Sequence, residues 1–418
     1  MKTLLYFEEY ESNLSHKLLN RVDIQPIIIR TNKNMRFFSD EYLETTKDIL
    51  NYVIDYYNDI DDEVDKFRKW LEDNKIIIDY FLNDSEYYLE FSNVFARKLG
   101  LYALSNEQIG WVRDKVDMKK RFRQIGLDTV MFKEINNKNE LKDFFVSNGC
   151  KRIIFKPRRG MNSIETYMIN SLEDIENLDI DIIPGKYMAE DFCYDREWSI
   201  ESLVQDGQVL DSYVTYIPNP TIWASISNDL NCHMTVTQIP SYFKFVPKKF
   251  IQQIVSGMDL KDGVMTIEVF ISDDGNVKAS ELGWRLPGCQ ATLNHSYSYG
   301  IDIYNILLDI AIHKKVNLEY NERVVSVGDL YLPNKEGIIK KITPLEELLK
   351  MDGVIDGEMF AKVGEYQKKR RVGNDASGWV LVIGENEFDT LRKMKSIYDA
   401  FEIEVFDYKE GKKYVRKM

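Results

Sequence analysis

Two glutamates in neighbouring strand-like runs offer the clearest chemistry in the sequence. Glu268 lies in residues 265–270, and Glu281 lies in residues 277–285. Residues 273–276 (Asp-Asp-Gly-Asn) separate the runs and accept positive φ, so we expect a β-hairpin. Like charges opposite each other destabilise a sheet unless a cation lies between them, and Mg²⁺ prefers oxygen ligands. The hairpin is therefore a candidate Mg²⁺ site, with two solvated surface glutamates as the open alternative.

Two lysines and a basic loop are candidate phosphate ligands. Lys115 follows Asp114, which can cap a helix, and a positive charge in a first helical turn is unfavourable unless an anion lies nearby. Lys156 ends an apolar run, and residues 158–163 (Arg-Arg-Gly-Met-Asn-Ser) follow it after one proline. Guanidinium groups on a flexible backbone suit phosphate binding. An exposed lysine and a basic hairpin turn are the alternatives that the residues leave open.

A strand-like run at residues 186–193 contains two adjacent carboxylates, Glu190 and Asp191, and Glu197 follows it. Such a strand can present backbone N–H and C=O groups to the edge of a purine, while a later carboxylate can accept hydrogen bonds from ribose hydroxyls. The spacing alone assigns neither role, and ordinary acidic residues at a strand end are the alternative.

Composition narrows the class of protein. The chain has 418 residues, of which 44% are hydrophobic and 29% charged, as in a globular protein of several domains. The net charge of −13 disfavours nucleic-acid binding, although basic runs at 368–371 and 409–417 suit an acidic partner or a solvated surface. Cysteine and histidine spacing supports neither a disulfide framework nor a zinc site. Apolar runs are too short for a membrane span and no signal peptide is evident, so we expect a cytoplasmic protein.

The elements that must position these residues fall into four regions. Residues 1–110 alternate strand-like and helical runs, which predicts an open parallel α/β sheet, and they contain no dinucleotide or Walker motif. The runs are strands at 2–7, 23–30 and 76–81 and helices at 40–74 and 85–99.

The later regions are expected to mix helices with antiparallel strands. Residues 111–187 form an α+β unit, residues 188–322 are strand-rich, and residues 323–418 form a smaller α/β unit. The helices expected there are at 114–125, 137–147, 172–178, 301–313 and 387–401, and strands are expected at 152–155 and 165–169.

Taken in order, these segments resemble the ATP-grasp superfamily, in the carboxylate-amine ligase branch that includes carbamoyl-phosphate-synthase-like and L-amino-acid-ligase-like proteins. The resemblance covers about residues 76–315. Its motifs are Asp114-Lys115 with Met118-Lys119, residues 155–157 (Phe-Lys-Pro), residues 189–192 (Ala-Glu-Asp-Phe), Ile267-Glu268, and Glu281 with Gly283 and Arg285.

The resemblance implies an α/β and α+β architecture, the ATP-grasp fold. Its parts would be an N-terminal open parallel α/β domain (1–110), a first helix with a mobile lid subdomain (111–187), a central antiparallel-sheet catalytic domain (188–322) and a C-terminal α/β cap (323–418).

The resemblance also implies roles for single residues. The ATP-binding residues would be Lys115, Lys156, Arg158, Ser163, Glu190, Asp191, Phe192, Cys193 and Glu197, with Glu197 on the ribose. Glu268 and Glu281 would coordinate Mg²⁺, with Mn²⁺ as an alternative. Arg285 and Lys156 would be catalytic, and the candidates for binding substrate are Arg285, Gln290 and His295. A general base and a hydrogen-bonded structural residue are both open for His295.

One position departs from the family pattern. The family usually has Asn where this chain has Gly283, so one direct metal ligand is missing. A water, a neighbouring side chain or bidentate Glu281 would replace it, or one metal would bind, or catalysis would be impaired.

The implied activity is that of an ATP-dependent carbon–nitrogen ligase. It would activate a carboxylate as an acyl phosphate and join it to an amine, releasing ADP and phosphate, with amino-acid-like small molecules as substrates. The alternatives are a ligase acting on a peptide, a phosphoryl transferase, and a nucleotide-binding protein without ligase turnover. No nucleic-acid or membrane partner is expected, and a homodimer is left open.

Overall fold

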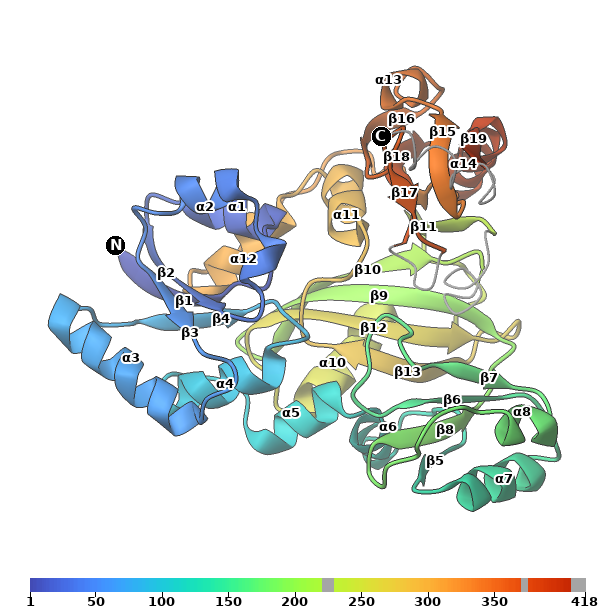
Figure 1. Cartoon of the computed structure of the whole chain (residues 1–418), viewed down its shortest axis with the longest axis horizontal. Coiled ribbons are helices and arrows are strands. Elements are labelled where there is room, and N and C mark those ends of the chain that lie inside the picture. Colours follow the sequence, from blue (N-terminus) through green and yellow to red (C-terminus); the bar gives the residue numbers. More distant parts are fainter. Residues whose placement is uncertain (220–228, 370–374, 407–418) are drawn as a thin grey trace, which may run out of the picture.

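The computed structural model describes residues 1–219, 229–369 and 375–406. The basic run at 409–417 lies outside these residues, and that at 368–371 lies partly outside them. The described strands form four sheets: a parallel N-terminal sheet, a lid sheet, a large central sheet and a small C-terminal sheet (Figure 1). None of the described helices combines the length and the apolar character that crossing a membrane requires.

The N-terminal region is the expected open parallel sheet, in the order β3-β2-β1-β4. Strands β1 and β2 are apolar on both faces, as parallel strands covered by helices must be. The elements are β1 Lys2–Phe7, α1 Asn13–Leu19, β2 Ile24–Thr31, η1 Met35–Phe37, α2 Asp40–Thr45, β3 Asn51–Ile54, α3 Ile60–Asn74, β4 Tyr80–Asn83, α4 Leu89–Lys98 and α5 Asn106–Arg113.

The prediction of one long helix at 40–74 is wrong. Strand β3 interrupts it and pairs with β2, so that Ile28 lies opposite Asn51. Tertiary pairing overrides local helical preference there. The strand expected at 76–81 is β4, which begins later, at Tyr80, and α3 before it ends with Lys75 as a left-handed C-cap residue.

The region expected to be a lid contains a four-stranded antiparallel sheet in the order β5-β8-β6-β7, which we call the lid sheet, with two helices packed on it. Its helices and the strands β6 and β7 lie close to their predicted positions, whereas β5 was not predicted. The region comprises α6 Lys115–Gln124, β5 Phe132–Ile135, α7 Lys138–Ser147, β6 Ile153–Pro157, β7 Tyr167–Ile169, α8 Leu172–Glu176 and β8 Tyr187–Asp191.

The central sheet is antiparallel and has the order β13-β12-β9-β10-β11-β14-β18-β16. One face carries the site described below, and α10 packs on the sheet through Phe250, Ile251 and Ile254. Helix α10 was not predicted, because its helical spacing lies within an aromatic, strand-rich stretch. The elements are β9 Arg196–Gln205, β10 Gln208–Tyr216, β11 Asn231–Thr235, α10 Pro247–Gly257, β12 Gly263–Ile271, β13 Val277–Gly283, α11 Ala291–Tyr299 and α12 Ile303–Ala311.

The C-terminal region contributes to two sheets. Strands β14, β18 and β16 continue the central sheet across residue 323, and α14 packs on β14 and β18. The remaining strands form the small sheet β17-β15-β19. The elements are β14 Ser326–Tyr331, β15 Gly337–Ile342, α13 Leu345–Leu348, β16 Val354–Met359, β17 Tyr366–Gln367, β18 Gly378–Gly384, α14 Glu387–Ala400 and β19 Ile403–Phe406.

The turn between β12 and β13 requires glycine at position 275. Gly275 has φ +81°, and a Cβ atom there would lie 1.7 Å from the backbone oxygen of Tyr242. Gly149 also has positive φ, +69°, but a Cβ atom there would meet nothing within 4 Å. Position 275 therefore combines backbone strain with a steric clash, whereas position 149 has the strain alone.

We expect Gly275→Ala to lower the Tm clearly more than Gly149→Ala does. The control, Gly149→Ala, has only the cost of a left-handed residue, about 1–2 kcal/mol. Gly275→Ala must also displace the backbone of Tyr242. Thermal unfolding of both variants, followed by circular dichroism, measures the difference. Equal Tm values would show that the hairpin does not need this close approach.

Candidate active site

The two glutamates of the hairpin lie directly opposite each other. Glu268 on β12 pairs with Glu281 on β13 in the antiparallel register, which confirms the predicted hairpin. Burial, Glu197 and Glu281 together raise the pKa of Glu268 to about 8. This concentration of carboxylate oxygens fits a divalent cation with oxygen ligands. Gly283, next on the same strand face, adds no side-chain ligand.

Three lysines form a largely buried chain of alternating charges with Glu190 and Glu281. Lys156 Nζ contacts Glu281 and lies 2.5 Å from Glu190 Oε1. Lys119 Nζ lies 3.1 Å from Glu190 Oε2, and Lys115 Nζ lies 3.2 Å from Glu281 Oε2. Burial alone would raise the pKa of Glu281, but Lys115 and Lys156 outweigh it and lower that pKa well below its usual value. We call these five residues the charge chain.

Helix α6 presents two of the lysines one turn apart. Asp114 caps the helix by accepting hydrogen bonds from the N–H groups of residues 116 and 117, as its sequence position predicted. Lys115 and Lys119 are both buried, and Lys119 is completely so. Lys119 belongs to a motif of the resemblance, but no role was predicted for it. Its spacing of four residues from Lys115, on the same helix face, was the available signal.

The loop after β6 contains two predicted phosphate ligands, Ser163 and Arg158, and only one of them faces the cavity. Ser163 lines the cavity described below, and it and Asn162 have positive φ, a conformation often associated with ligand-binding loops. Arg158 is not among the lining residues, because its guanidinium group pairs with Asp114 and Glu134. Within the structure described here, Arg158 therefore supports the helix cap rather than facing the cavity.

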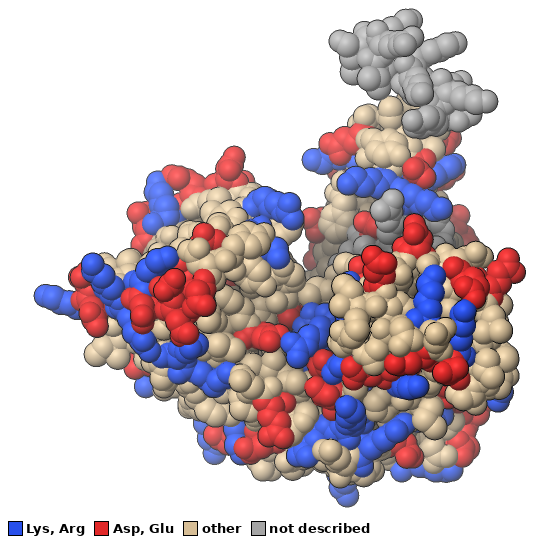
Figure 2. Space-filling model, turned by 60° about the horizontal axis from the view of Figure 1, so that its bottom comes forward, with Lys and Arg blue, Asp and Glu red and all other residues tan. Residues whose placement is uncertain are grey.

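A cavity of about 320 Å³ lies over the sheet face that carries the glutamates. Most of the predicted site residues line it, although they come from the lid, the hairpin and the strands between. Figure 2 shows an indented surface between the N-terminal region and the rest of the chain, with basic and acidic atoms inside it. The predicted residues in its wall are Lys115, Lys156, Ser163, Glu190, Asp191, Phe192, Cys193, Glu197, Glu268, Glu281 and Arg285.

The strand expected to face a purine is β8, and its end lines the cavity. The N–H groups of Asp191 and Phe192 donate to Met131 O and Arg152 O, at 2.9 and 3.2 Å. The Glu190 side chain points to Lys119 and Lys156. Any contact of Glu190 with a base would therefore involve its backbone.

Arg285 pairs with Glu86, a contact that was not predicted. Its Nε donates to Glu86 Oε2 at 2.9 Å, and Arg113 lies 3.3 Å from the other oxygen of Glu86. Glu86 also lines the cavity. No spacing rule connects residues about 200 positions apart, so only the folded chain reveals this contact.

The other two candidate substrate ligands lie away from the cavity. Gln290 is the N-cap residue of α11 and is absent from the cavity wall. His295 is completely buried, and its Nε2 lies 2.7 Å from Glu201 Oε2, while Nδ1 lies 3.2 Å from the Thr235 hydroxyl. This is the geometry of a hydrogen-bonded structural histidine, the second of the two readings left open for it.

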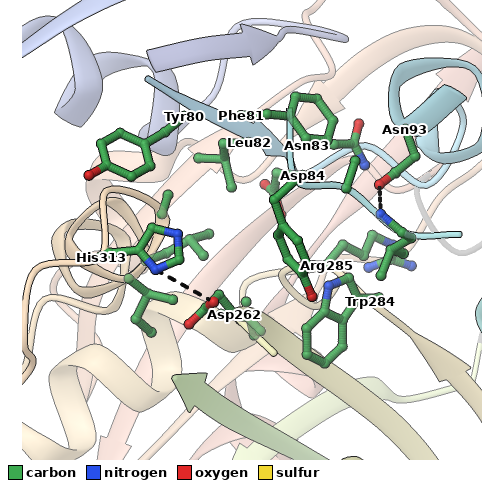
Figure 3. Close-up of a pocket in the computed structure, with 18 of the residues that line it drawn as sticks. Tyr80, Phe81, Leu82, Asn83, Asp84, Asn93, Asp262, Trp284, Arg285 and His313 are labelled. Carbon is green, nitrogen blue, oxygen red and sulfur yellow. Dashed lines mark hydrogen bonds and ion pairs between the residues drawn. The ribbon is translucent and has the colours of Figure 1, made fainter. Parts of the chain in front are cut away.

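A second, smaller cavity of about 150 Å³ lies on another side of Arg285 (Figure 3). Among the predicted site residues it contains only Arg285. Its wall includes Asp84, which accepts a hydrogen bond from the Leu286 N–H at 2.8 Å, and burial raises the pKa of Asp84 to about 7. Asp262 and His313 face each other at 3.8 Å across the far end.

Comparison with known sequences gives one relative of named activity. An L-arginine-specific L-amino acid ligase from Bacillus subtilis is 21% identical over 263 residues, which are 61% of this chain. The match spans 63% of that protein, less than two thirds of its length. No protein-family model matches the chain.

Solved structures extend the likeness to nearly the whole chain. An L-amino acid ligase from Bacillus licheniformis superposes with a TM-score of 0.74 at 17% identity, covering 97% of this chain and 99% of that one. An N5-carboxyaminoimidazole synthase from Aspergillus clavatus, in complex with ADP and 5-aminoimidazole ribonucleotide, has a TM-score of 0.68 at 14% identity, covering 95% and 98%. The lid, the central sheet and the parallel N-terminal sheet therefore make up one known arrangement, and the chain has the ATP-grasp fold.

Proposed function

We propose that the chain is an ADP-forming ligase that activates a carboxylate with ATP and joins it to an amine. The observation that carries the proposal is the meeting of Glu268, Glu281, Lys115 and Lys156 in one cavity beside Arg285. The relative named as an L-amino acid ligase supports amino-acid-like small molecules as substrates.

Lys115 and Lys156, the two lysines of the charge chain that line the cavity, are suited to hold the phosphates of ATP. Lys115 and Lys156 share Glu281 as a counter-ion, so phosphate oxygens can take over this charge balance when the nucleotide binds. Ser163 and the loop around it would cover the phosphates. The end of β8 and Glu197 would hold adenine and ribose.

Glu268 and Glu281 would hold Mg²⁺, which supplies neutralisation of phosphate charge when it is bound. Phosphoryl transfer depends mainly on positioning and charge neutralisation, and the lysines and Arg285 provide both. Arg285 would stabilise the acyl phosphate, with Glu86 holding its guanidinium group in place. The lid would exclude water, because hydrolysis of the acyl phosphate competes with attack by the amine.

Product analysis tests the proposal directly. The protein is incubated with Mg²⁺, ATP and amino-acid mixtures, and ADP release is measured together with mass spectrometry of the products. We expect ADP release that requires both an acid and an amine and accompanies an amide product. A stable phosphorylated product without an amine would instead indicate a phosphoryl transferase. Tight ATP binding with no turnover for any amino-acid or peptide acceptor would indicate a binding protein.

Removing the charge of Glu281 should abolish turnover. We expect Glu281→Gln to lower kcat at least about 100-fold, since the variant loses a metal ligand and the shared counter-ion of two lysines. Its Tm should also fall, because breaking a buried ion pair is destabilising. Asp274→Asn is the matched control, because it removes an exposed carboxylate from the turn of the same hairpin. Activity of Glu281→Gln within a few-fold of wild type would refute the metal assignment.

Substitutions at position 283 test whether the metal site lacks a ligand there. A Cβ atom on Gly283 would lie 3.6 Å from Arg285 Cγ, an ordinary contact, so a Cβ atom fits there. We expect Gly283→Asn to lower several-fold the Mg²⁺ concentration that gives half-maximal rate, because the amide oxygen adds a ligand.

The matched control is Gly283→Ala, which adds the Cβ atom without an oxygen. It should produce no such gain. If the two variants have the same Mg²⁺ dependence, the site does not lack a ligand at this position.

A further inference from the structure

His233 lies at the opposite end of the cavity from the paired glutamates. It is on β11 and lines the same cavity as Glu268 and Glu281. The central sheet places β11 three strands away from β12, about 14 Å between backbones at 4.8 Å per strand. The space over the sheet between them is where an acyl group and its attacking nucleophile would lie under the proposed function.

A buried carboxylate orients the imidazole. His233 Nδ1 lies 3.0 Å from Asp329 Oδ2, and the two residues are directly opposite each other on β11 and β14. Asp329 is completely buried, and its other oxygen accepts a hydrogen bond from Asn294 Nδ2 at 2.5 Å. An ionised carboxylate only accepts hydrogen bonds, so Nδ1 carries a hydrogen. Nε2 is therefore the nitrogen available to a ligand, and it has no hydrogen-bond partner among the described residues.

The surroundings of His233 keep the imidazole basic. Burial lowers its pKa, but the Asp329 carboxylate outweighs burial, and Glu197 and Glu201 on β9 act in the same direction, so the pKa lies above 6.5. Cys289 from the loop before α11 and Tyr331 from β14 are the other titratable groups beside it. Histidine is the side chain that most often acts as a general base near neutral pH, and His233 lines the cavity.

We propose that His233 Nε2 accepts the proton that the amine loses when it attacks the acyl phosphate. The inference rests on the proposed function and adds a catalytic residue to it. In this step the amine nitrogen forms the C–N bond, the bond from the acyl carbon to the phosphate oxygen breaks, and the electron pair leaves with inorganic phosphate. The proton passes from nitrogen to Nε2 and then to solvent. Asp329 is a positioning residue, because it acts through the ring and does not touch the amine.

The test separates formation of the acyl phosphate from attack by the amine. Hydroxylamine is largely neutral at pH 7 and depends less on a base, so it traps the acyl phosphate as a hydroxamate. We expect His233→Asn to lower the kcat for amide formation about 10²–10⁴-fold, the range of general base catalysis. ATP-dependent hydroxamate formation should stay within a few-fold of wild type. His16→Asn, at an exposed histidine, is the matched control.

Asp329→Asn gives a second readout that a purely structural role would not produce. Only the neutral imidazole can accept a proton, so amide formation should rise with pH through the pKa of His233. Without the carboxylate that raises this pKa, the rising limb should move to lower pH and the maximal rate should fall. His233→Asn should lose the limb altogether, and a circular dichroism spectrum like that of wild type would establish folding of both variants.

Three outcomes would overturn the inference. Equal losses of hydroxamate and amide in His233→Asn would assign the residue to activation of the acid or to folding. A raised KM for the acid or the amine with unchanged kcat would make His233 a binding residue. An unshifted pH limb in Asp329→Asn would place the base elsewhere. Failure of the wild-type protein to form any hydroxamate would refute the proposed ligase function itself, which keeps the two failures distinguishable.

Discussion

A largely buried chain of alternating charges links three parts of the molecule, running Lys119–Glu190–Lys156–Glu281–Lys115. An uncompensated buried charge costs several kcal/mol, so each member requires its neighbours. The members come from α6, from the lid strands β6 and β8, and from the hairpin strand β13. The charge chain therefore fixes α6, the lid sheet and the central sheet relative to one another, and it places two lysines where phosphates would bind under the proposed function.

The antiparallel sheet gives this cavity two chemically different ends. Its register aligns Glu281, Glu268, Ser199, Thr215 and Thr235 in one row across five strands. Carboxylates and lysines lie at one end of the row, and the imidazole of His233 lies two residues from Thr235 at the other. The proposed reaction, which begins with transfer of a phosphate and ends with attack by an amine, would use both ends, and Arg285 and Glu86 line the cavity as well.

Local patterns were sufficient for much of the fold. The hairpin turn with Gly275, the capped helix after Asp114 and the helix at 137–147 each depend on residues close together in the chain, and the structure confirms them. The prediction was wrong at residues 40–74, where β3 forms by pairing with the edge of β2, a segment distant in the chain. It also missed α10, whose helical spacing of apolar residues lies within an aromatic, strand-rich stretch.

By itself, the sequence determined which residue types stand at which local spacing, and this was enough to predict the glutamate pair and to single out Lys115 and Lys156, while the family resemblance singled out Gly283. Only the tertiary structure decided the partners of these groups. It paired Arg285 with Glu86, turned Arg158 away from the cavity, buried His295 against Glu201 and joined His233 to Asp329. The physical reason is that such contacts depend on strand order and on the distances it creates, so residues far apart in the chain meet without any spacing signal.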